Sequence, residues 1–136
     1  MAKILKINHI AIAVPELEES LSFWQQQLGL KLDHVEDVPS QQSQVAFLPI
    51  GESEVEIVIP ASDDSGMAKY LEKRGPGLHH ICFEVDNIDE MLAELKAKGV
   101  RLIDETAKEL PGRKMAFIHP KSANGVLVEL YEVTKS

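Results

Sequence analysis

The chain has 136 residues, which is enough for one ordinary domain or for two small halves that share a core. Hydrophobic residues make up 44% of it and charged residues 26%, which is typical of a globular protein. The formal net charge of −8 argues against a general nucleic-acid-binding protein, because such a protein needs a basic surface. The single cysteine, Cys82, excludes an internal disulfide framework and indicates a reducing compartment.

Neither a signal peptide nor a membrane span is expected. Residues 1–20 lack a basic segment followed by an apolar run, and no stretch approaches the roughly 18 apolar residues of a spanning helix. We therefore predict a cytoplasmic protein that has neither nucleic acid nor membrane as a partner.

The first half of the chain predicts a strand, a helix and three further strands. Apolar alternation indicates a strand at residues 4–14, and Pro15 then opens a helix that Gly29 ends. The apolar stripe of this helix consists of Leu17, Leu21, Trp24 and Leu28. The three strands are expected at about 30–37, 44–49 and 54–59.

The second half repeats this order. A strand at 78–85 leads into a helix, with Asp86 as the expected N-cap and Gly99 at the end. The apolar stripe of this helix consists of Ile88, Met91, Leu92 and Leu95. Strands are expected at about 100–105, 114–118 and 126–132.

The repeat predicts an α+β fold of two paired βαβββ modules in a single domain, residues 1–136. Module 1 covers about 4–60 and module 2 about 78–133, and a linker at 61–77 holds a short helix near 67–73. Neither half alone would bury much core, so we expect the halves to pair rather than to form independent domains.

The repeat also duplicates a histidine and a glutamate. His9 corresponds to His80 and Glu56 to Glu129, and in each module both point away from the strand face that packs on the helix. A single histidine on a strand is more often structural, but duplicated histidines and carboxylates on rigid strands favour a site for a divalent ion such as Co²⁺, Mn²⁺, Ni²⁺, Fe²⁺ or Zn²⁺.

Two neighbours of His80 are assigned to packing. His79 faces the opposite side of the strand and is expected to be structural. Cys82 is expected to be a small packing residue, because no base for it is evident.

Several stretches resemble the vicinal oxygen chelate superfamily and, within it, the methylmalonyl-CoA epimerase family. The stretches are Asn8–Val14, Val45–Gly51, Lys69–Gly75, Gly77–Ile81, Phe117–Ser122 and Gly125–Leu130. The resemblance implies a curved mixed-sheet cup with helices outside, which holds a divalent metal, most often Co²⁺. Glyoxalase I shares the His-Glu-His-Glu set but usually ends in an Asp-Pro-Asp-Gly turn, which this chain lacks.

The implied activity is an isomerase that inverts the α-carbon of methylmalonyl-CoA, or a similar acyl-CoA, through an enolate. A metal on His9, Glu56, His80 and Glu129 would stabilise the enolate, and Glu129 would be one of two acid–base residues. The alternatives are a glyoxalase I-type lactoylglutathione lyase, and a non-catalytic small-molecule-binding protein of the same fold.

The chain departs from the family at the second base. Family members usually carry a glutamate in a loop after the second strand, whereas Ser40 stands at the matching position here with Gln41 beside it. Neither is a credible base, so we expect Glu56, Glu36 or Asp37 to take the role, unless the substrate itself differs.

The acyl-CoA would also need contacts outside the metal centre. Ser40 and Gln41 are candidate substrate contacts, and the candidate contacts for the CoA phosphates are Arg113, Lys114 and Lys121. An exposed sheet edge in such small modules also favours a homodimer.

Overall fold

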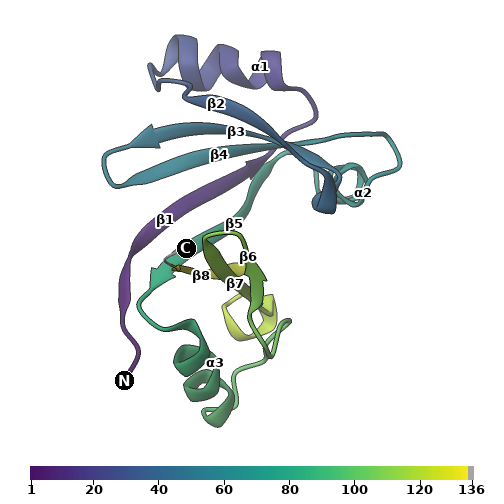
Figure 1. The fold of residues 1–136 in the computed structure, drawn as a ribbon. Helices are drawn as coiled ribbons and strands as arrows, with labels where there is room; N and C mark the ends of the chain where they lie inside the picture. The colour runs from purple at the N-terminus through teal and green to yellow at the C-terminus, as the bar shows by residue number, and fades with distance from the viewer. Residues whose placement is uncertain (135–136) are drawn as a thin grey trace. The chain divides into compact units, whose positions relative to one another are not determined.

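The computed structural model describes residues 1–134, and none of the helices in that range is long and apolar enough to cross a membrane (Figure 1). Module 1 runs through β1 (Ile4–Ala13), α1 (Leu17–Leu21), the π-helix η1 (Ser22–Gln27), β2 (His34–Val38), the 3₁₀ turn η2 (Pro39–Gln41), β3 (Ser43–Ile50) and β4 (Ser53–Pro60). After α2 (Gly66–Arg74), module 2 runs through β5 (Gly77–Val85), α3 (Ile88–Ala97), β6 (Lys108–Leu110), β7 (Arg113–Ile118), η3 (Pro120–Ser122) and β8 (Val128–Val133). The predicted α+β class and the βαβββ order of both modules are confirmed.

The chain divides into two compact units whose borders lie within strands. Unit 1 comprises Met1–His9 and His80–Ser136, and unit 2 comprises Ile10–His79. Both β1 and β5 therefore contribute residues to each unit, and the first nine residues belong to the unit that holds most of module 2.

Unit 2 packs α1 on a sheet in the order β2-β3-β4-β1, and Figure 1 shows α1 lying along β2, β3 and β4. Its core joins Val14, Ala46, Leu48, Ile57 and Ile59 to the helical residues Leu17, Leu21 and Trp24. The stripe prediction is wrong for Leu28, which is 54% exposed. The reason is the wider π-helical turn, seen in the bond from Leu28 N to Phe23 O, which rotates the following residues away from the regular stripe.

Unit 1 contains the order β1-β5-β8-β7-β6, in which β5 and β8 are parallel and the last two pairings are antiparallel. The stripe of α3 packs as predicted on a core that includes Val85, Ala116, Ile118 and Leu130. The predicted N-cap is one residue off. Asn87 caps α3 by accepting from Glu90 N, whereas Asp86 Oδ1 accepts from Lys3 N at 2.8 Å and ties the N-terminal segment to this unit.

The strand expected at 100–105 is absent from the described structure. That segment makes only an isolated bridge between Leu102 and Ile118, and the edge strand is β6 instead. Three hydrogen bonds explain the irregularity. The backbone N–H groups of Ile103 and Asp104 both donate to Phe117 O, while the Asp104 carboxylate accepts from Phe117 N and replaces a ladder bond. The Asp104 side chain therefore makes the hydrogen bond to β7 that a strand backbone was expected to make.

Leu92 tests how far unit 1 depends on α3. Its side chain is 3% exposed within the core, so Leu92→Ala should lower the free energy of unfolding by about 2–5 kcal/mol, through lost burial and the cavity left behind. Chemical denaturation followed by circular dichroism measures this change. Ile103→Ala, at a side chain that is 52% exposed, is the control and should change stability by less than about 0.5 kcal/mol. Equal effects of the two variants would contradict the packing described.

Candidate metal centre

Three strands of unit 1 bring two histidines and a glutamate together. His9 comes from β1, His80 from β5 and Glu129 from β8, and the order β1-β5-β8 makes these strands neighbours. His80 Nε2 lies 2.9 Å from Glu129 Oε1, His9 Nε2 lies 3.2 Å from the same oxygen, and the two Nε2 atoms are 3.2 Å apart. All three residues are buried, with exposed fractions of 4%, 9% and 6%.

The chemistry of this donor set fits a divalent cation. Neutral imidazole nitrogens and a carboxylate oxygen all carry lone pairs, and a cation held among them would satisfy all three at once. Metal–ligand bonds of about 2.1 Å at right angles would place neighbouring donors about 3 Å apart, which agrees with the three separations. Two histidines and one carboxylate on one side of an ion leave its other positions open.

The electrostatics of Glu129 depend on the two histidines. Burial by itself would raise the pKa of this carboxyl, but hydrogen bonds with His80 and with His9 outweigh burial and lower the pKa from 4.5 to about 2. Glu129 is therefore held as a carboxylate at neutral pH, as a metal ligand must be. A pKa this low is far from the optimum for a general base near pH 7, so it favours the ligand role over the proton-transfer role.

Cys82 lies closer to this centre than its sequence context indicated. It is fully buried, it is the register partner of Glu129 on β8, and its sulfur lies within 4.8 Å of the His9 and Glu129 donor atoms. A buried thiol can pack or can ligate a soft metal. His80 supplies a donor at shorter distances, so the sulfur is the second candidate for the third position.

Two residues around His9 were missed by the reasoning from sequence. Asn8 Oδ1 lies 2.7 Å from His9 Nδ1, where it can accept a hydrogen bond from the ring, and Asn8 Nδ2 donates to Glu84 Oε1 at 3.1 Å. Glu84 follows His80 by four residues on the same strand, so strand alternation places both on one face and could have pointed to it. Nothing in the sequence signals that Asn8 bonds to its own neighbour.

Glu56, the expected fourth ligand, belongs to unit 2. It lies on β4 opposite Phe47 of β3 and is half-buried. Ser40 and Gln41 lie in η2 of the same unit, followed by Gln42 in the left-handed backbone region with φ of 51°. The structure thus brings His9, His80 and Glu129 together and describes these other three residues in a separate unit.

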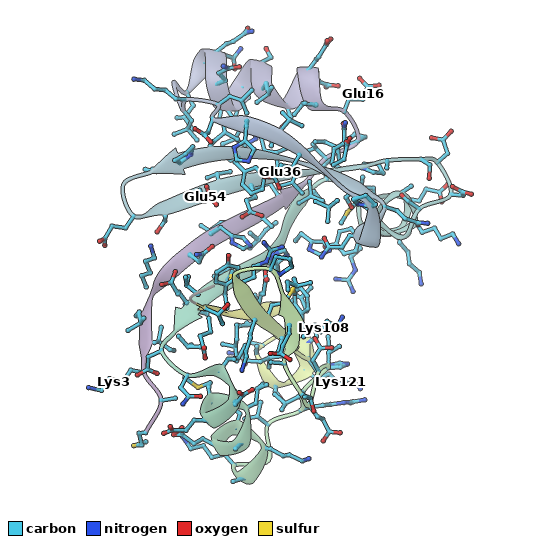
Figure 2. All side chains as sticks on the ribbon, in the orientation of Figure 1. Lys3, Glu16, Glu36, Glu54, Lys108 and Lys121 are labelled. Carbon is cyan, nitrogen blue, oxygen red and sulfur yellow. The ribbon has the colours of Figure 1, made fainter. Side chains whose placement is uncertain are left out.

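The three basic residues expected near CoA differ in their surroundings. The Arg113 guanidinium lies 6.0 Å from the centre of the Tyr131 ring. Lys114 Nζ is 2.9 Å from Asp89 Oδ2, and this bond raises the pKa of the lysine, so its charge is already paired. Lys121 lies in η3 and is exposed, and Figure 2 shows its side chain at the edge of unit 1.

Residues 8–117 match the family model of the Glyoxalase/Bleomycin resistance protein/Dioxygenase superfamily. The chain belongs to this superfamily.

Its relatives in this superfamily include epimerases of acyl-CoA thioesters. Human mitochondrial methylmalonyl-CoA epimerase is 39% identical over 127 residues, which cover 92% of this chain and 72% of the human protein. An ethylmalonyl-CoA/methylmalonyl-CoA epimerase of Cereibacter sphaeroides is 35% identical over 94% of this chain and 98% of that protein. A solved structure of methylmalonyl-CoA epimerase in complex with methylmalonyl-CoA and NH4+ is 32% identical, with a TM-score of 0.86 over 97% of this chain and 96% of that chain. The resemblance seen in the sequence is thereby confirmed.

The low pKa of Glu129 can be tested by titrating this protein in its metal-free form. Nuclear magnetic resonance of the side-chain carboxyl should give a titration midpoint near pH 2. Because the folded pKa lies below the ordinary value, the ionised carboxylate stabilises the fold above about pH 4.5, and this contribution is lost as the pH falls toward 2. His80→Ala removes the larger of the two hydrogen bonds and should raise the midpoint. His79→Ala is the matched control and should leave it in place; equal midpoints in all three proteins would contradict the geometry.

Proposed function

We propose that the chain is an epimerase that inverts the α-carbon of methylmalonyl-CoA, or of a closely similar acyl-CoA. The observation that carries the proposal is the buried group of His9, His80 and Glu129, in a chain that aligns along most of its length with such epimerases. A solved relative of the same fold contains methylmalonyl-CoA itself, which supports the substrate class. The protein is therefore an isomerase.

We propose that a divalent ion binds His9 Nε2, His80 Nε2 and Glu129 Oε1, and that Co²⁺ is the native ion. The mutual distances of about 3 Å and the burial of the three donors support binding of a divalent ion at these atoms, and the choice of Co²⁺ rests on the family resemblance. Glu56 is proposed as the fourth ligand on the sequence repeat, in which it corresponds to Glu129. The ion would supply the positive charge that makes an enolate accessible from a thioester.

The protein side of the reaction is a pair of proton transfers at one carbon. One group removes the α-proton from one face of the substrate, and a second group returns a proton to the other face. We propose Glu129 and Glu56 for the two roles. The burial of Glu129 supports this role because it limits competition from water, whereas the low pKa of its carboxyl in the metal-free protein favours its role as a ligand.

The choice of Glu56 over the other carboxylates rests on what surrounds them in unit 2. Glu36 is exposed on β2, where Figure 2 labels it, and its Oε1 is 2.9 Å from His34 Nε2. Asp37 is also exposed and accepts from Gln44 Nε2 at 2.9 Å. Glu56 is the half-buried member of the three, so its carboxylate is better shielded from water than the other two.

For the CoA phosphates we propose Arg113, Lys114 and Lys121 as contacts, and for the acyl portion Ser40 and Gln41. Exposure favours Lys121 among the basic residues, because Asp89 already neutralises Lys114. We also propose that the protein acts in the cytoplasm as a homodimer. Cys82 is the one cysteine of the sequence, which agrees with a reducing compartment, and analytical ultracentrifugation would determine the oligomeric state.

The proposed reaction predicts exchange of the α-proton with solvent. With Co²⁺, D₂O and a single enantiomer of methylmalonyl-CoA, deuterium should enter C2 faster than in a control without enzyme. His80→Ala should reduce the rate to that background because it removes a ligand, and His79→Ala should leave exchange active. Mass spectrometry of the CoA ester measures the label. Absence of exchange, together with turnover of a glutathione hemithioacetal, would contradict the epimerase assignment and indicate a glyoxalase activity instead.

The second base is tested by separating exchange from inversion. If Glu56 serves one face of the substrate, Glu56→Gln should still exchange the proton of one enantiomer but should lose inversion by at least about 100-fold, the usual scale of general acid–base catalysis. Glu36→Gln and Asp37→Asn are the controls and should keep both activities. Metal content is measured in parallel, since loss of the ion would lower exchange and inversion together. Retained inversion in Glu56→Gln would exclude Glu56.

A further inference from the structure

Asn8 and Glu84 form a chain of hydrogen bonds behind His9, on the side of the ring away from Glu129. We propose that these two are positioning residues that hold the ring proton of His9 on Nδ1 and so keep Nε2 available as a donor. The inference rests on the proposed metal site for its purpose, but its geometry lies wholly within unit 1. It adds a function for Asn8 and Glu84 that the repeat of His9 and His80 does not imply.

The carboxylate of Glu84 can only accept hydrogen bonds. Because Glu84 Oε1 accepts at 3.1 Å, the end of the Asn8 amide that faces it must be the NH₂ group. The other end of the amide, Oδ1, then faces His9 Nδ1 at 2.7 Å. A carbonyl oxygen can only accept, so Nδ1 must carry the proton. Glu84 thus fixes the orientation of the amide, and the amide fixes the tautomer of the imidazole.

A second hydrogen-bond acceptor, on the other side of the His9 ring, competes with Asn8 for the ring proton. Glu129 Oε1 lies 3.2 Å from His9 Nε2 and accepts a hydrogen bond from it when the ring carries both protons, but it would also accept the single proton of the neutral ring. A proton on Nε2 would block the lone pair that a metal needs. The contact on the Asn8 side is shorter by about half an ångström, and Lys6 Nζ, 3.9 Å from Glu84 Oε1, helps to hold the carboxylate in place. The balance therefore favours the Nδ1–H form.

The structure around these residues limits rearrangement. His9 is 4% exposed and the Glu84 side chain is 17% exposed, so water competes little for their hydrogen bonds. Asn8 lies on β1 and Glu84 on β5, and both strands are held in the sheet of unit 1. A metal-binding histidine usually donates its second ring N–H to such a partner, and loss of that partner typically weakens metal binding about 10- to 100-fold.

Glu84→Gln removes the directional constraint with little change of shape. An amide at position 84 can pair with either end of Asn8, so the Asn8 amide is free to turn and to offer its NH₂ group to His9. We expect the Nε2–H tautomer of His9 to become populated and the affinity for Co²⁺ to fall about 10- to 100-fold. Asn8→Leu, which removes the acceptor altogether, should have at least as large an effect.

The decisive variant exchanges the two side chains. In the double variant Asn8→Asp with Glu84→Gln, a carboxylate faces His9 Nδ1 and an amide stands behind it to donate to that carboxylate. The same proton position is enforced with the same total charge, so the Nδ1–H tautomer and most of the Co²⁺ affinity should return. Glu109→Gln, the same chemical change at an exposed position of β6, is the control and should alter neither quantity.

Two measurements compare the native protein with these variants. Long-range ¹H–¹⁵N spectra of the metal-free proteins, at a pH where the ring is neutral, report the tautomer of His9. Chelator competition reports the affinity for Co²⁺. Nδ1–H in the native chain, Nε2–H in Glu84→Gln and recovery in the exchanged pair would support the proposal. An unchanged tautomer in Glu84→Gln would overturn it. Since the spectra need neither metal nor substrate, failure of the epimerase assignment would leave this test intact.

Discussion

The arrangement of unit 1 depends on a carboxylate buried between two imidazoles. Glu129 is 6% exposed, and without partners its charge would carry a large desolvation penalty. Contacts of 3.2 Å with His9 and 2.9 Å with His80 offset that penalty. As a result, the pKa of the Glu129 carboxyl lies near 2. The same contacts require three strands to lie side by side at a fixed register, which ties the first nine residues of the chain to its second half.

The opposite face of this sheet explains why the strands stay in place. Val85, Ala116 and Leu130 pack against α3, so β5 and β8 each carry an apolar residue on one face and a site residue on the other. The phase matters, because a slip of one residue would turn the donors into the apolar core and the core residues out of it. The aromatic ring of Phe117, with its centre 5.6 Å from that of His80, adds an apolar wall beside the site.

Much of this could be predicted because alternation along a strand is a local property of the sequence. The faces of His9, His80 and Glu129 follow from it, as do the module order and the stripe of α3. Features that depend on contacts between segments could not be predicted. Asn87 rather than Asp86 caps α3 because Asp86 is bonded to Lys3, far away in the sequence. Leu102 lies in no strand because the Asp104 side chain replaces a backbone hydrogen bond there. The hydrogen bond from Asn8 to Glu84 joins two strands that only the folded sheet brings together.

The central claim is that His9, His80 and Glu129 are the ligands of a divalent ion. X-ray absorption at the cobalt edge of the Co²⁺-loaded protein tests it most directly. The proposed ligand set predicts a first shell of nitrogen and oxygen only, at about 2.1 Å, with outer-shell scattering from two imidazoles. In the His80→Ala protein, and likewise in the His9→Ala protein, the spectrum should show scattering from one imidazole instead of two. A sulfur shell at about 2.3 Å would assign Cys82 as a ligand and contradict the proposed set, as would a native spectrum with fewer than two imidazoles.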